Sequence, residues 1–204
     1  TAGGGGAIYS QAATGSVIGL LAFGSWAAVI AAGEYSRQTM VVSLTTVPRR
    51  AVFYGAKLAA AATAAAAGSL VSAVLGFAVV LAVTPHATHR IGDPATLLSI
   101  VLVVVAVTAI GVAAGILTRS PAASIAAVFA VVLIPQAAGG LLGTLQPWIV
   151  GASPGPVIAQ IVGNSELATN QTYPPGAAAA AATLVALAVA IAAGGAYALL
   201  RRDG

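Results

Sequence analysis

Long stretches without a charged residue limit what this chain can fold into. The stretch from Leu97 to Gly115 contains no charge and is apolar on every face of a helix, unlike the alternating positions of a transmembrane β-strand. Only 6% of the 204 residues are charged, against roughly 25% in soluble domains. The sequence therefore predicts an all-α, polytopic transmembrane helix bundle that forms a single domain over residues 1–204.

The apolar stretches divide the chain into candidate spans. About 20 apolar residues cross a hydrocarbon core of about 30 Å as a helix. Five ranges meet this requirement: 15–33, 55–83, 97–118, 122–143 and 177–200. The second range is longer than a span needs, so it is expected to tilt or protrude, with Lys57 snorkelling to the interface.

Basic residues indicate the orientation of these spans, because Lys and Arg stay on the cytoplasmic side of short loops. Of the eight Lys and Arg residues, six fall in alternate segments, Lys57 lies at the adjoining inner end of the second span, and Arg90 is the exception. The predicted cytoplasmic segments are 34–54, 119–121 and the C-terminus, and the predicted outer segments are 84–96 and 144–176. Thr1 would then lie outside, which predicts a further helix upstream and six spans in total.

The outer segment 144–176 is long and rich in proline, and it carries Trp148 and Tyr173. Aromatic residues of this kind gather at the lipid headgroups. We expect short interfacial or re-entrant helices here.

Residues for covalent chemistry are scarce. Cysteine is absent, and the acidic residues Glu34, Asp93, Glu166 and Asp203 lie in four different segments. No span carries an ionisable residue in its middle, where functional charges of membrane enzymes usually lie, and no P-loop pattern occurs. His86 and His89 are interpreted as a solvated pair, since a metal would need more ligands. The sequence predicts no enzyme activity, no cofactor, no metal and no nucleic-acid partner.

The segment 34–48, between the first two spans, reads as an amphipathic helix at the inner membrane surface. Glu34 is expected in its first turn, at the positive end of the helix dipole. One arc of its helical wheel carries Met40, Val41, Leu44 and Val47, and another carries Ser36, Thr39, Ser43 and Thr46. Pro48 would end the helix, and Arg49 with Arg50 would anchor the chain that follows.

These residues resemble a family, the permease subunits of ATP-binding-cassette (ABC) exporters of the bacterial type-2 class. The matching positions are Gly33, Glu34, Tyr35, Thr39, Leu44, Val47, Pro48, Arg49, Arg50, Ala56 and Lys57. The resemblance implies a coupling helix that contacts a separate ATPase subunit, which would bind ATP and Mg. It implies the interface residues Glu34, Tyr35, Arg37, Thr39, Met40, Val41, Leu44, Val47, Pro48, Arg49 and Arg50.

The resemblance also implies a function and a location. The chain would pair with a second permease, identical or different, in the plasma membrane of a bacterium, and form half of an export pathway. A hydrophobic or amphipathic substrate fits the apolar spans best. Two alternatives stay open: a non-transporting scaffold or sensor that docks a soluble partner through the same helix, and half of a secondary transporter, for which internal repeats are expected.

Overall fold

The computed structural model describes residues 16–36, 50–83, 94–163 and 169–202. Within these ranges the chain is all-α, as predicted, with seven α-helices and three short 3₁₀ turns. The helices are α2 (Ser16–Ser36), α4 (Arg50–Val83), α5 (Pro94–Thr118), α6 (Pro121–Ala137), α7 (Gln146–Ile149), α8 (Pro154–Ile161) and α9 (Ala177–Arg202). Four of them, α2, α4, α5 and α9, are long and apolar enough to cross a membrane.

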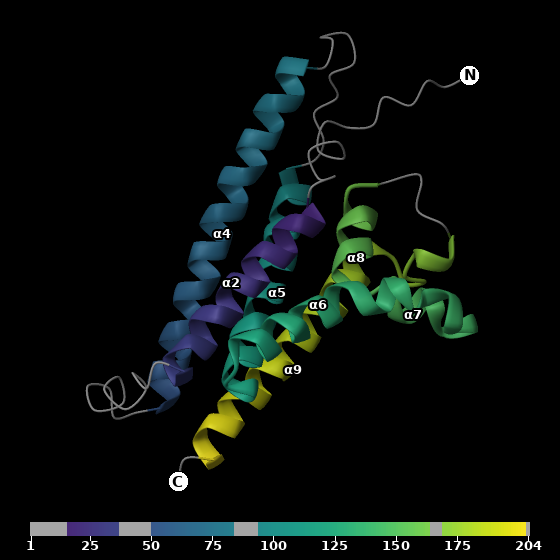
Figure 1. The fold of residues 1–204 in the computed structure, drawn as a ribbon. Coiled ribbons are helices and arrows are strands. Elements are labelled where there is room, and N and C mark those ends of the chain that lie inside the picture. The colour runs from purple at the N-terminus through teal and green to yellow at the C-terminus, as the bar shows by residue number, and fades with distance from the viewer. Residues whose placement is uncertain (1–15, 37–49, 84–93, 164–168, 203–204) are drawn as a thin grey trace, which may run out of the picture.

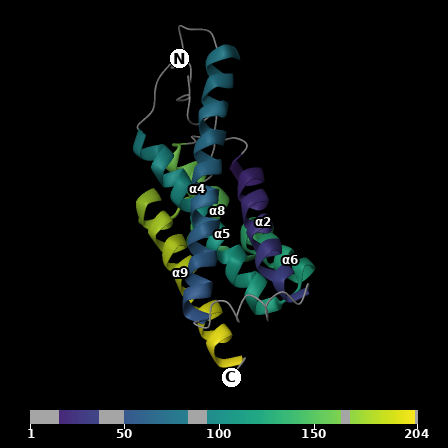
Figure 2. The same ribbon diagram turned by 90° about the vertical axis from the view of Figure 1, so that its left-hand side faces the viewer.

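The long helix α5 forms the centre of the bundle, with α2, α4, α6 and α9 around it (Figure 1, Figure 2). Its residues Val103, Val107 and Ala113 are almost completely buried. This helix is apolar all round, as expected of a helix that is surrounded by other helices. A turn of the chain at Arg119 and Ser120 then leads into α6.

Glycines let α5 approach α2 closely. A Cβ atom placed on Gly111 would collide with the carbonyl oxygen of Gly24, and one on Gly115 would lie 2.6 Å from the carbonyl oxygen of Ala28. Backbones in lipid pack closely where small residues face each other. Gly111 and Gly115 therefore allow close packing of α5 on α2, whereas Gly19 has open space around it.

The helix α4 is the longest and stands partly apart. Its 34 residues correspond to a length of about 51 Å, and it extends past the neighbouring ends of α2 and α5 (Figure 1, Figure 2). Near its far end Val74, Val79 and Val83 are exposed. Such an apolar surface suits contact with lipid rather than with water.

The fourth predicted span is shorter than expected. The range 122–143 was predicted, but α6 ends at Ala137 after 17 residues, about 25 Å. Pro135 lies inside its last turn, and the chain continues through Gly139 and Gly140 as the 3₁₀ turns η3 (Gly139–Leu141) and η4 (Gly143–Leu145). Proline removes a helix donor and glycine favours other conformations, which explains the early end.

The described residues between Gly143 and Gly176 form short helices and turns. The turn η5 (Thr169–Gln171) lies beside α7, and α8 packs into the bundle through Val157 and Ile158, which are buried. The amide of Gln160 holds the segment together. Its Nε2 donates to the carbonyl oxygen of Gly151 at 2.8 Å, and its Oε1 accepts from the backbone N–H of Tyr173 at 2.9 Å.

Candidate functional site

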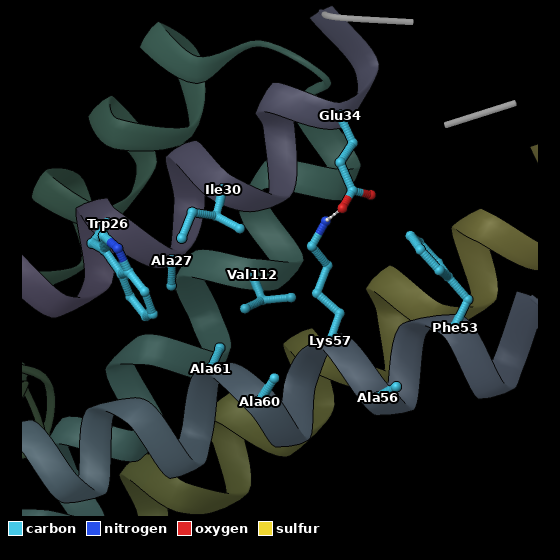
Figure 3. A pocket seen from close by; sticks show the side chains of 10 residues that line it. All are labelled: Trp26, Ala27, Ile30, Glu34, Phe53, Ala56, Lys57, Ala60, Ala61 and Val112. Carbon is cyan, nitrogen blue, oxygen red and sulfur yellow. Dashed lines mark ion pairs between the residues drawn. The ribbon is translucent and has the colours of Figure 1, made fainter. Parts of the chain in front are cut away.

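The end of α2 and the beginning of α4 meet at an ion pair. Glu34 lies two residues before the end of α2, and Lys57 lies about two turns into α4. The Lys57 Nζ atom is 2.7 Å from Glu34 Oε1 (Figure 3). The side chain of Lys57 is 10% exposed and that of Glu34 is 28% exposed. The pair therefore joins, at one end of the bundle, the two helices on either side of residues 37–49.

The position of Glu34 corrects one prediction. Glu34 was expected in the first turn of an amphipathic helix, but it lies near the C-terminal end of α2. A carboxylate is unfavourable by about 0.3–1 kcal/mol at that negative end of the helix dipole. Lys57 supplies the compensating positive charge. Lys57 was in turn expected to snorkel to the interface, whereas its ammonium is turned to Glu34.

A cavity of about 350 Å³ lies beside the ion pair, between α2 and α4, and Val112 of α5 forms part of its wall (Figure 3). The rest of its wall is apolar apart from Glu34 and Lys57. The ring of Phe53 lies at the charged end, with its centroid 5.5 Å from Lys57 Nζ. This distance permits a cation–π interaction between the Phe53 ring and the Lys57 ammonium.

A hydrogen bond of Tyr54 fixes the same part of α4 to α9. The Tyr54 hydroxyl donates to the carbonyl oxygen of Ala192 at 2.8 Å and is buried. Gly195 makes room for it, since a Cβ atom at that position would lie 3.1 Å from the hydroxyl oxygen. The first turns of α4 are therefore held from two sides, by α2 through Glu34 and by α9 through Tyr54.

Apolar packing surrounds these polar contacts. Ala31 of α2, Tyr54 of α4, Ile116 of α5 and Leu199 of α9 belong to one buried cluster. The ends of α2, α5 and α9 and the beginning of α4 thus lie together (Figure 1). The segments predicted to be cytoplasmic are those that adjoin these helix ends. The distribution of basic residues requires that these segments lie on one side of the membrane, and the helix ends that they adjoin lie on one side of the bundle.

Most of the predicted coupling residues lie outside the described part of the chain. These are Arg37, Thr39, Met40, Val41, Leu44, Val47, Pro48 and Arg49. Tyr35 belongs to α2 and Arg50 begins α4, but only their backbone is described. Of the residues singled out in the sequence, the structure brings together Glu34 and Lys57, and also Trp148 and Tyr173. His86 and His89 also lie outside the described ranges.

A second cavity, of about 320 Å³, lies between α6, α7, α8 and α9 and is lined by Pro135, Trp148 and Leu187 among others. The Trp148 ring meets the Tyr173 ring edge to face, with centroids 5.5 Å apart. Within the described ranges, no group of three or more His, Asp or Glu residues is placed to hold a metal ion.

The fold and the site define a broad class, a multi-pass membrane protein built from helices, four of which are long and apolar enough to span. Comparison with protein families, curated proteins and solved structures gives no match. The assignment to a function therefore depends on the residues themselves.

Proposed function

We propose that this chain is the transmembrane permease subunit of an ATP-driven exporter, and that residues 34–50 couple it to a separate ATPase subunit. The observation that supports the proposal best is the ion pair between Glu34 and Lys57. Both residues belong to the set that resembles type-2 ABC permeases. Their contact joins the two helices on either side of the proposed coupling segment.

The arrangement favours transmission of movement from the coupling segment to the bundle. A force on residues 37–49 would act first on the last turn of α2 and the first turns of α4. Those turns are tied to each other through Glu34 and to α9 through Tyr54. Packed helices of this kind shift between discrete arrangements rather than deform continuously. ATP-driven closure of the partner would thereby change the packing of the spans.

In this proposal the chain carries out no covalent chemistry. ATP and Mg would bind to the partner ATPase, and a second permease would complete the pathway for a hydrophobic or amphipathic substrate. The membrane would be the plasma membrane of a bacterium. The five ranges considered as spans, and a coupling segment between α2 and α4, belong to this proposal.

The test is co-purification with a P-loop ATPase, followed by ATPase and transport assays in reconstituted complexes. The Met40→Ala/Leu44→Ala variant should weaken docking, because each buried side chain of this size contributes roughly 1.5–3 kcal/mol. The matched control is Ser43→Ala/Thr46→Ala, on the other arc of the predicted helix. If the apolar variant retains wild-type docking and transport-linked ATP hydrolysis, the coupling role is refuted, and a scaffold or sensor becomes the better explanation.

A further inference from the structure

The cavity between α2 and α4 has a charged end and an apolar body. Glu34 and Lys57 form the charged end, and Trp26, Ile30 and Ala60 line the body (Figure 3). Trp26 and Glu34 are eight positions apart on α2, which corresponds to about 12 Å along the helix axis. A volume of about 350 Å³ lies within the range of sites that hold small molecules. A ligand with a polar head and an apolar tail would match the charged end and the apolar body of the cavity.

The depth of the cavity in a bilayer agrees with such a ligand. Glu34 is the last residue of the candidate span in α2, which begins at Val17. In a bilayer crossed by this span, the charged end of the cavity would lie where the headgroups begin, and its apolar body would lie one to two turns further into the hydrocarbon. A lipid in this position would keep its head and its acyl chain at their usual levels.

The charges indicate which kind of head fits. An ammonium group has three N–H donors. Among the described residues, the Lys57 ammonium is paired with one anionic oxygen, Glu34 Oε1, and no other acceptor lies within hydrogen-bonding distance. The pair is neutral as a whole. An anionic head would leave a net negative charge in a partly desolvated site, which is costly, whereas a head that carries both signs adds no net charge.

We propose that this cavity binds a zwitterionic membrane lipid of the phosphoethanolamine type. The lipid phosphate accepts hydrogen bonds from Lys57 Nζ, its ammonium group donates to the Glu34 carboxylate, and one acyl chain lies along Trp26 and Ile30. Charge-assisted hydrogen bonds of this kind are about twice as strong as neutral ones. The proposal does not depend on the exporter function, and its test requires no ATPase.

The test is lipid binding to the purified full chain in detergent, measured by native mass spectrometry. Phosphatidylethanolamine, phosphatidylglycerol and diacylglycerol with the same acyl chains are compared in competition. Phosphatidylethanolamine should bind about tenfold more tightly than diacylglycerol, the change expected from one charge-assisted contact, and more tightly than phosphatidylglycerol. Equal binding of diacylglycerol, or a preference for phosphatidylglycerol, overturns the proposal.

Variants locate the binding in the cavity. Ala60→Leu fills the cavity without changing either charge and should reduce phosphatidylethanolamine binding about tenfold. Ala59→Leu is the matched control, since Ala59 is also exposed on α4 but does not line the cavity. Ala56→Leu, at another lining position, replaces Ala60→Leu if that variant does not fold. Unchanged binding in a folded cavity-filling variant refutes the site.

Discussion

Removal of one partner from the ion pair between Glu34 and Lys57 should destabilise the bundle unequally. At the observed 2.7 Å two unit charges attract by about 6 kcal/mol for an effective dielectric constant of about 20. Much of this attraction is offset by the desolvation of both groups, so replacement of both partners should cost far less than breaking the pair.

The exposed fractions of the two side chains determine which single substitution costs more free energy of unfolding. Glu34→Gln leaves the Lys57 ammonium, whose side chain is only 10% exposed, without its carboxylate, and should lower the free energy of unfolding by about 3 kcal/mol. Lys57→Met leaves Glu34, which is 28% exposed and can regain water, so a loss of about 1–2 kcal/mol is expected. The double variant should lose less free energy of unfolding than the sum of the two single losses. The difference from that sum should be about 1–3 kcal/mol.

The assay is reversible unfolding of the purified protein in mixed micelles, followed by circular dichroism, on wild type, both single variants and the double variant. Glu34→Gln combined with Arg201→Met is the control, because Arg201 stacks on Tyr197 rather than on Glu34. That combination should be additive. Additivity within about 0.5 kcal/mol for Glu34→Gln and Lys57→Met as well would refute the ion pair.

Three further predictions concern packing, hydrogen bonding and topology. Gly111→Ala should destabilise the protein by about 1–3 kcal/mol through overpacking, whereas Gly19→Ala, with open space at its Cβ position, should not; thermal unfolding measures both. Tyr54→Phe removes the hydrogen bond to the carbonyl oxygen of Ala192 and should cost about 0.5–1.5 kcal/mol. The exposed Tyr197→Phe should change little, and equal melting temperatures of the two variants contradict the role of Tyr54. Because the chain has no cysteine, an impermeant thiol reagent applied to intact cells should label Ser165→Cys and not Ser43→Cys, and the reverse pattern would invert the topology.

The apolar stretches were enough to predict an all-α chain with long membrane-compatible helices. The end of the fourth stretch was wrong because the prediction counted apolar residues up to 143 and gave too little weight to Pro135 and the glycines after it. Hydropathy records the transfer of side chains to lipid, whereas the end of a helix depends on backbone donors and glycine flexibility. Helix existence and helix length are therefore set by different features of the sequence.

The site was less predictable. Glu34 and Lys57 were both noticed, but their pairing depends on how α2 and α4 come together. The sequence did contain an indication of this pairing, since residues of opposite charge lie at the adjoining ends of two consecutive spans. The hydrogen bond of Tyr54 carried a weaker signal, because a buried tyrosine hydroxyl needs an acceptor but any backbone carbonyl can supply it. Likewise, spacing alone could not separate Gly111 from Gly19, because the difference lies in the facing helix.

The length of α4 makes this helix sensitive to the acyl chains around it. Beyond Lys57 its sequence has no charged residue as far as Val83, an uncharged length of about 39 Å against about 30 Å of hydrocarbon. This hydrophobic mismatch of about 9 Å must be met by tilt or by local thickening of the bilayer, at a cost of fractions of a kcal/mol per ångström. Longer lipid chains would reduce that cost and let α4 stand more upright, so bilayer thickness would act directly on the helix that carries Lys57 and Tyr54.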